Sequence, residues 1–239
     1  MEKQIIISIG REHGSEGHKI AELLAQKLDF PLYDKNIFEE IGKTKGIDTN
    51  DISKYDERPR RFFITRKVNG HSNSPEENVA ELQFALLKSK AADGDSFVVV
   101  GRCSDQLFRG MEGAISIFIT GDMPDKIAHL MDVENRTEAD AKKEIEKHDK
   151  RRRQYHDYFF PNSKWADSRS YDICVNSSRL GVEGTVEFLY DFINKFRIRN
   201  SEFRETLIAM RKIRELWIKK VEWWMMKIQN SGFRIQRDV

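Results

Sequence analysis

The chain has 239 residues, of which 39% are hydrophobic and 33% are charged, and its formal net charge is +2. This length is enough for one α/β domain with an appendage, and a net charge near zero argues against a nucleic-acid footprint along the whole chain. No apolar run approaches the roughly 20 residues that span a bilayer, and none resembles a signal segment. Because the two cysteines, Cys103 and Cys174, show no disulfide or metal spacing, we expect a reduced, cytoplasmic protein.

Five short apolar runs predict the buried strands of a parallel sheet. In chain order they are residues 4–9, 31–34, 97–101, 115–120 and 171–176. Apolar residues at helical spacing follow the first run, from Ile20 to Leu28, and the last run, from Val182 to Phe196. This alternation predicts an α/β fold with a parallel five-stranded sheet, helices on both faces, and ligands beyond the carboxyl ends of the strands.

Two stretches depart from this alternation. Residues 42–78 are polar, contain no clear strand, and include the basic segment RPRRFFITRK at 58–67. An insertion of this length is usually functional or disordered, and we expect a mobile loop. Residues 137–160 are highly charged and predict a helix with little apolar face.

The glycine turn, residues 10–17, joins the first predicted strand to the first predicted helix. Gly10, Gly14 and Gly17 would let backbone N–H groups point at phosphate oxygens, and the helix that follows would attract negative charge. The pattern G-x-x-x-x-G-K-[ST] is not met, because no lysine follows a glycine at that spacing. The glycines alone therefore leave two interpretations open, a phosphate site and a tight strand-to-helix turn.

Four segments in order give the chain a more specific resemblance. ISIGREHGSEGHKIAELLAQKLDFPLYDKNIFEEI at 7–41 resembles the S-R-x-x-G-S-G-G-x-x-I-A and Y-D-K segments of the cytidylate kinase-like P-loop proteins. VVVGRCSDQLF at 98–108, DKRRRQYHDYF at 149–159 and residues 170–193 resemble later segments of the same family. The resemblance covers about residues 4–195. It implies a P-loop NTPase-type three-layer sandwich and phosphoryl transfer from ATP, with Mg²⁺ and an arginine-rich lid.

In the glycine turn, the resemblance places Gly17 where P-loops normally carry their lysine. The residues implied to bind the ATP phosphates are Gly10, Arg11, Gly14, Ser15, Gly17, His18 and Lys19. Arg11 or Lys19 could supply the missing charge, and the family pattern favours Arg11. His13 and His18 could instead be surface histidines. Glu16 stands where the family commonly has glycine, and its carboxylate would repel phosphate unless it points outward or helps to hold Mg²⁺.

The residues implied to face the phosphoryl acceptor come from three other segments. Asp34 could orient the acceptor or bind Mg²⁺, and it could equally cap the helix that follows. Arg102 could grip a monophosphate, or it could form a structural pair with Asp105. Arg58 and Arg61 lie in the insertion where a monophosphate-binding segment belongs.

The predicted lid lies in residues 137–160. Its implied members are Lys150, Arg151, Arg152, Arg153 and Tyr155, with Arg152 on the arginine of the family's D-K-x-R-x-x-Y pattern. Arginines that close over a transferring phosphoryl group stabilise its charge. The alternative is a solvent-exposed helix stabilised by ion pairs.

Residues 197–239 form a compositionally separate, basic segment, with 11 Lys and Arg against 5 Asp and Glu. A helix is predicted from Ser201, as a possible N-cap, to near Gly232. Its apolar residues follow alternating steps of four and three residues, interrupted by Arg214. Packing on the domain or a homodimer, contact with an anionic membrane surface, and binding of an acidic or other partner all remain open.

The sequence thus predicts a P-loop domain in residues 1–196 and a basic helix in residues 197–239. The predicted function is an ATP-dependent phosphotransferase of the nucleoside monophosphate kinase type, with Arg11, Arg152 and Asp34 in catalysis and CMP as one acceptor to test. No specific nucleic-acid partner is expected. Two rival functions remain: a catalytically silent nucleotide-binding regulator, and an interaction protein that acts through its basic helix.

Overall fold

The computed structural model describes residues 4–34, 37, 67–68, 71–72 and 74–230. Their centre is a five-stranded sheet in the order β2-β5-β1-β6-β7, in which every neighbouring pair of strands is parallel. The strands are β1 (Ile6–Arg11), β2 (Leu32–Tyr33), β5 (Phe97–Val100), β6 (Ala114–Thr120) and β7 (Ile173–Asn176). The predicted α/β fold with a parallel five-stranded sheet is therefore confirmed.

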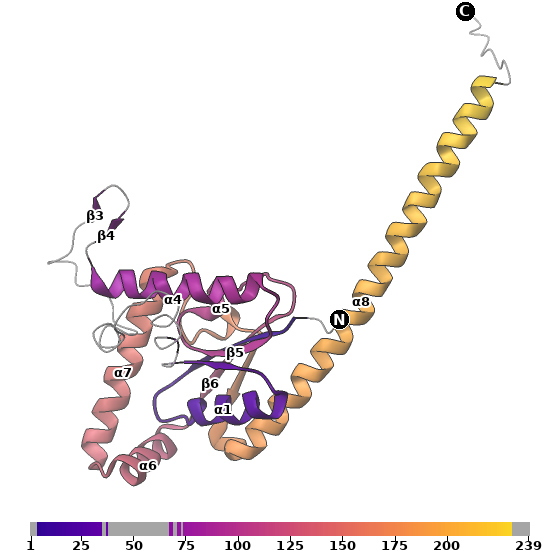
Figure 1. Ribbon diagram of the computed structural model, residues 1–239. Coiled ribbons are helices and arrows are strands. Elements are labelled where there is room, and N and C mark those ends of the chain that lie inside the picture. Colours follow the sequence, from indigo (N-terminus) through magenta and orange to yellow (C-terminus); the bar gives the residue numbers. More distant parts are fainter. Residues whose placement is uncertain (1–3, 35–36, 38–66, 69–70, 73, 231–239) are drawn as a thin grey trace, which may run out of the picture. The chain divides into compact units, whose positions relative to one another are not determined.

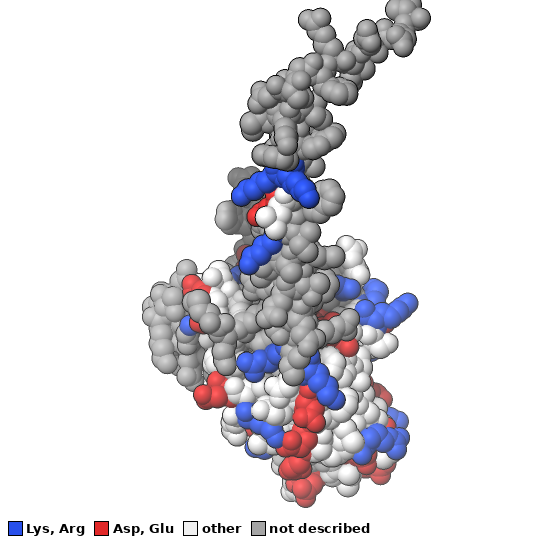
Figure 2. Space-filling view, turned by 90° about the vertical axis from the view of Figure 1, so that its right-hand side faces the viewer, with Lys and Arg blue, Asp and Glu red and all other residues white. Residues whose placement is uncertain are grey.

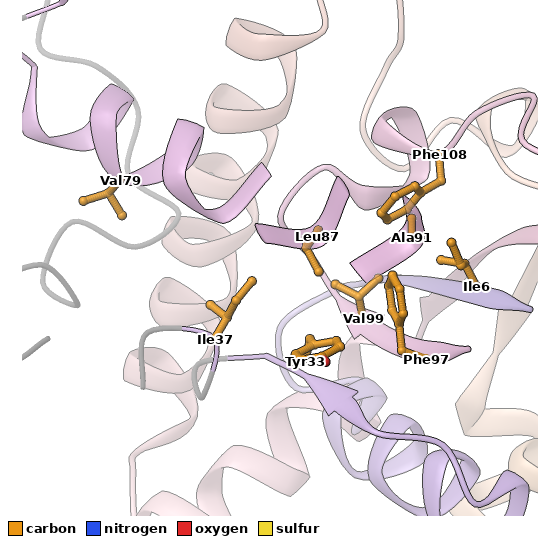
Figure 3. Close-up of a cluster of buried hydrophobic side chains, with 9 residues drawn as sticks. All are labelled: Ile6, Tyr33, Ile37, Val79, Leu87, Ala91, Phe97, Val99 and Phe108. Atoms are coloured by element: carbon orange, nitrogen blue, oxygen red, sulfur yellow. The ribbon is translucent and has the colours of Figure 1, made fainter. Parts of the chain in front are cut away.

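Helices cover both faces of this sheet. On one face lie α4 (Pro75–Ala92) and the short α5 (Ser104–Leu107), and on the other lies α1 (Gly17–Leu28) (Figure 1). Side chains from α4 and the sheet form the apolar cluster of Figure 3, in which Phe97 packs edge-on against Tyr33, with ring centroids 5.3 Å apart. On the opposite face, Lys27 of α1 pairs with Glu187, which holds α1 beside the first part of α8 (Ser177–Asn230). The sheet is thus the middle layer of three.

The charged stretch after β6 forms two helices, α6 (Met123–Glu134) and α7 (Glu138–Phe159), followed by the short helix η1 (Ser168–Ser170). Thr137 caps α7, because its side chain accepts a hydrogen bond from the N–H of Asp140. Helix α7 buries four side chains, including Tyr155 and His156. It is therefore part of the packed domain and not a fully solvated helix.

The predicted insertion at 42–78 ends earlier than expected. Helix α4 begins at Pro75, and Ser74 caps it by accepting a hydrogen bond from the N–H of Glu77. Ser-Pro-Glu-Glu is a helix-start signal, so residues 75–78 belong to the domain. The expectation of no strand was also wrong, because β3 (Lys67–Val68) pairs with β4 (His71–Ser72) in an antiparallel ladder. Arg58 and Arg61 lie outside the described residues.

Helix α8 runs from Ser177 to Asn230, with one break in its helical geometry at Gly181, whose φ is 67°. Ser201 lies inside α8, so the predicted helix start and N-cap at Ser201 were wrong. No Gly or Pro stands between Glu183 and Ser201 except Gly184, so nothing in the sequence stops the helix there. The chain divides into two compact units, Met1–Ile193 and Asn194–Val239. Across the described residues, none of the helices has the length and apolarity needed to cross a membrane.

Candidate active site

The glycine turn lies at the carboxyl end of the central strand β1. Gly10 is still part of β1, and a Cβ added there would lie 2.8 Å from the Phe118 ring, so this glycine serves close packing. Gly14 has a φ of 80° and passes over Lys126, whose carbonyl oxygen would be 3.0 Å from an added Cβ. Gly17 opens α1. The three glycines therefore differ in role: Gly10 allows close packing, Gly14 adopts a positive φ, and Gly17 begins α1.

A cavity of about 300 Å³ opens beside this turn, at the sheet edge where parallel-sheet proteins bind ligands. We call it the main cavity. It is lined by Arg11, Glu12, His13, Gly14, Glu16, Gly17, His18, Asp34, Arg102, His129, Leu130, Glu134 and Arg152. Seven of the predicted site residues, from four separate segments, meet here: Arg11, Gly14, Gly17, His18, Asp34, Arg102 and Arg152. The topology therefore brings together residues more than 100 positions apart in the chain.

Arg11 and Gly17 fit together at the point where a P-loop lysine would stand. A Cβ added at Gly17 would lie 2.6 Å from the Cβ of Arg11, so any larger residue would collide with the arginine. Lys19, the other proposed source of charge, has a side chain that is 57% exposed and pairs with Glu22, 3.4 Å away. Arg11 is thus the cation that the glycine turn contributes to the main cavity, as the sequence favoured over Lys19.

Ser15 is turned into the protein. Its hydroxyl donates to the Glu12 carbonyl oxygen, at 2.9 Å, and the side chain is buried. The carbonyl oxygen of Ser15 accepts from the Ser177 hydroxyl at 2.8 Å. Its predicted contact with phosphate therefore does not involve the hydroxyl in this arrangement. Ser15 fixes the shape of the turn.

A largely buried ion pair joins α6 to Glu12, one of the residues that line the main cavity. Lys126 Nζ of α6 lies 2.8 Å from Glu12 Oε2, which also accepts from the Thr120 hydroxyl at 2.7 Å. Burial alone would raise the pKa of Glu12, but the hydrogen bonds from Lys126 and Thr120 outweigh it and lower the pKa. Glu12 is therefore held ionised, and Lys126 neutralises its charge.

Helix α7 is joined to the glycine turn by Asp149. Its carboxylate accepts a hydrogen bond from the N–H of His13 at 2.8 Å and lies 3.6 Å from the Arg152 guanidinium. Arg152 in turn donates to the Arg11 carbonyl oxygen at 3.3 Å. Burial raises the pKa of Asp149, although the His13 N–H and Arg152 oppose the rise. Asp149 thereby fixes both the turn and the orientation of Arg152.

Two stacked imidazoles reinforce the same contact. The rings of His13 and His148 lie 4.3 Å apart at an interplanar angle of 13°. Burial, followed by the nearby charge of His148 and Arg152, lowers the pKa of His13 to about 4, and burial also lowers the pKa of His148. Both rings are therefore neutral at pH 7. His13 is not a surface histidine, which corrects the second interpretation given to it.

Carboxylates occupy two other sides of the main cavity. Asp34 Oδ2 lies 3.4 Å from His18 Nε2, and its side chain is 18% exposed. Glu16 adopts a left-handed conformation, with a φ of 55°, and its carboxylate lies 3.7 Å from His129 of α6. Glu16 therefore lines the main cavity beside His129, and the expected repulsion of phosphate stays a prediction.

Arg102 follows β5 in an unusual backbone conformation. It is 2% exposed, its φ is 57°, and it donates to the Val100 carbonyl oxygen at 3.2 Å. Positive φ at a non-glycine residue costs energy and is concentrated at functional sites. Asp105 is hydrogen-bonded to the buried His156, at 3.0 Å, a partner that the sequence did not suggest. Asp105 lines a smaller neighbouring cavity and not the main one.

The basic run of α7 divides between several environments. Arg152 lines the main cavity, whereas Lys150 is exposed, Arg151 contacts His148, and Arg153 lies over the Trp165 ring. Tyr155 is buried against Ala80 and Cys103. The predicted group of lid residues is therefore not one cluster, because side chains 100° apart around a helix face different neighbours.

Three cavity residues of α6, His129, Leu130 and Glu134, were missed from the sequence. So were Glu12, Lys126 and Asp149. The segment of α6 carries no motif, and its placement depends on how α6 and α7 pack together. Glu12 and Asp149 lie within the family segments quoted above, but no role was predicted for them. Asp149 did have one signal, since it directly precedes the basic run. Across the described residues, no group of three or more His, Cys, Asp or Glu is arranged as a metal site.

Comparison with known sequences decides the family. The profile of the cytidylate kinase-like family matches residues 6–179. The chain belongs to the cytidylate kinase-like family. Its match covers every strand of the sheet and all lining residues of the main cavity. The protein is thus kinase-like, and the resemblance predicted from the sequence is confirmed.

Several solved structures are similar to the chain to different degrees. A protein from Eubacterium ventriosum ATCC 27560, described as uncharacterized, is 33% identical over 80% of this chain and 99% of that chain, with a TM-score of 0.63. Shikimate kinase from Bacteroides thetaiotaomicron is 12% identical over 80% of this chain and 98% of that chain, with a TM-score of 0.47. A gluconokinase from Sinorhizobium meliloti 1021 is also 12% identical, over 86% and 98%, with a TM-score of 0.44. No curated protein matches the chain.

Proposed function

We propose that this member of the cytidylate kinase-like family transfers the γ-phosphoryl group of ATP to a nucleotide or a related small molecule, with CMP as the first acceptor to test. One observation carries the proposal. Arg11, Arg102 and Arg152, from three separate elements, line one cavity beside a glycine turn that opens a helix. Several arginines around a helix N-terminus are what a transferring phosphoryl group requires.

Each residue has a role in this proposal. The backbone N–H groups of the glycine turn and Arg11 would hold the ATP phosphates, and Arg152 would lie over the γ-phosphate. Arg102 and Asp34 would face the acceptor. An oxygen of the acceptor phosphate would attack the γ-phosphorus, the bond from that phosphorus to the β–γ bridging oxygen would break, and ADP would leave with the electron pair.

Mg²⁺ belongs to the proposal as a partner of the ATP phosphates, where it would neutralise charge on the transferring group. The oxygen donors beside the main cavity fit such an ion, because Asp34 and Glu16 supply carboxylates of the kind that Mg²⁺ prefers. Since few carboxylates converge on one point, the phosphates would supply most of its ligands. A cytoplasmic location, where ATP is present and cysteines stay reduced, completes the proposal.

A silent nucleotide-binding regulator is the second candidate, and Glu16 is the observation that favours it. Its carboxylate and that of Glu134 both line the main cavity, so the arginines do not act on phosphate unopposed. Such a protein would bind ATP and yet give no ADP with any acceptor. Binding and turnover must therefore be measured separately.

The test measures ADP formation from Mg-ATP with each common nucleoside monophosphate, beginning with CMP. We expect turnover with one of them, and a loss of about 10²–10³-fold in kcat in Arg152→Ala. Arg153→Ala is the matched control, because Arg153 is next to Arg152 in the chain but lies over the Trp165 ring and does not line the main cavity. Equal effects of the two variants would refute the role of Arg152. ATP binding by calorimetry without turnover would support the silent regulator.

A further inference from the structure

The apolar stripe of α8 continues in one register along almost the whole helix. From Val182 to Ile228 its positions follow alternating steps of four and three residues, and these are 182, 186, 189, 193, 196, 200, 203, 207, 210, 214, 217, 221, 224 and 228. All but Asn200 and Arg214 are apolar. Residues 203–228 of α8 are helical throughout, so the stripe positions of this part share one helix face.

The first part of the stripe already serves packing. Val186, Leu189 and Ile193 are buried in the unit Met1–Ile193, with Leu189 and Ile193 at 0% exposure. The second part, positions 203–228, belongs to the unit Asn194–Val239. Ile218, one residue after stripe position 217 and four after stripe position 214, borders the stripe and is 47% exposed. Leu216 is 67% exposed and lies farther round the helix, off the stripe. The second part therefore presents a large apolar side chain to solvent beside its stripe.

Charges on the second part are segregated around the helix. With the stripe taken as heptad positions a and d, five basic residues lie in it or at its flanking positions e and g: Arg204, Arg211, Arg214, Lys220 and Lys227. The acidic residues Glu205, Glu215 and Glu222 lie at positions b and f, away from the stripe, as do Lys212 and Lys219. The described side chains of Arg214 and Lys220 are exposed, and Figure 2 shows Lys and Arg side chains at the surface of this part of α8. The apolar stripe is thus bordered by positive charge alone.

We propose that residues 203–228 of α8 bind an acidic amphipathic helix of another protein in a coiled coil. The period of 3.5 residues is the one that lets two helices wrap around each other. A straight α-helix has 3.6 residues per turn, so on a flat membrane a stripe with a period of 3.5 would rotate away from the surface by about 20° per heptad. The bordering charges require Asp or Glu on the flanks of the partner, and Arg214 in the stripe requires an acidic residue opposite it.

A second copy of the chain fits this surface poorly. In a parallel pair, Arg214 would face Arg214 of the other copy in the apolar seam. The basic flanks would also meet basic flanks in either orientation, because acidic residues stand only on the far side between 203 and 228. Like charges at these positions oppose association. The partner is therefore a helix of opposite charge.

The test uses the full chain and a labelled synthetic helical peptide of about four heptads, with Leu in its seam and Glu at both flanking positions. A peptide with Lys at the flanking positions is the probe control. Binding is followed by fluorescence anisotropy at low and high salt. We expect binding of the Glu peptide, weaker binding at high salt, and no binding of the Lys peptide.

Two double variants carry the same change of charge and differ in their place on the helix. Arg211→Glu with Lys220→Glu alters the flanks of the stripe, and Lys212→Glu with Lys219→Glu alters the opposite side. We expect at least about tenfold weaker binding in the first and little change in the second. Equal losses, equal binding of both peptides, or no binding of the Glu peptide would overturn the proposal. Self-association of the wild-type chain that is lost only in the first variant would also overturn the proposal. So would binding of the wild-type chain to anionic vesicles, and not to the peptide, that is lost only in the first variant.

Discussion

Asp149 offers the sharpest test of how α7 is coupled to the glycine turn. Asp149→Ala removes the acceptor of the His13 N–H, which lies 2.8 Å away, and the carboxylate beside Arg152. A buried N–H left without a partner costs about 1–3 kcal/mol, and loss of a half-buried counter-charge adds to this. We expect a loss of about 2–4 kcal/mol in the free energy of unfolding.

Urea unfolding followed by circular dichroism would measure this loss. Asp149→Asn keeps an oxygen that can accept from His13, so we expect it to lose only about 1 kcal/mol. Glu146→Ala, at an exposed position of the same helix, is the control and should change stability by less than about 0.5 kcal/mol. If Asp149→Ala behaves like Glu146→Ala, or if the Asn and Ala variants are equally destabilised, the coupling that we describe is wrong.

Three further predictions concern the Lys126–Glu12 pair and the turn. Lys126→Met should cost about 2–4 kcal/mol of unfolding free energy, because Glu12 keeps its charge without the Lys126 counter-charge, and adding Glu12→Gln should restore most of it in urea unfolding. Gly14→Ala should weaken ATP binding in calorimetry and cost more stability than Gly94→Ala, because both glycines have positive φ but only Gly14 meets a neighbour, the Lys126 carbonyl. Folded His13 stays neutral down to a pKa of about 4, whereas the unfolded residue protonates near 6.5, so its contribution is present above pH 6.5 and is lost as the pH falls towards 4. Thermal melts of His13→Phe should therefore fall less steeply over that range than those of the wild type.

The sheet could be predicted because its strands carry their signal within a few residues. β1 nevertheless extends to Arg11 and not to residue 9, because Gly10 and Arg11 pair with Phe118 and Ile119 of β6. This extension of β1 depends on hydrogen bonding to β6, which the local sequence does not show, and the glycines from Gly10 onward indicated a turn instead of a strand. The start of α8 was misplaced for the opposite reason, since Ser201 resembles a cap and lies within a longer helix.

The site was predictable only where a residue follows a strand or belongs to a motif. Arg11 ends one strand of the sheet, and Asp34 and Arg102 follow two others, so their convergence is a consequence of topology. His129 and Glu134 reach the main cavity because α6 packs beside the turn, and no local pattern records that packing. Arg152 and Arg153 are adjacent residues of the same type, and they have different neighbours because successive side chains point about 100° apart around α7.

Glu16 is unfavourable in two independent ways, one in its backbone and one in its charge. Its left-handed backbone would cost a glycine nothing but costs a residue with a side chain about 1–2 kcal/mol. Its carboxylate also lines a cavity that three arginines line as well. A substitution to glycine would remove both penalties at once. The main cavity thus carries a negative charge of its own, and the phosphates of any ligand must be placed away from it or share a cation with it.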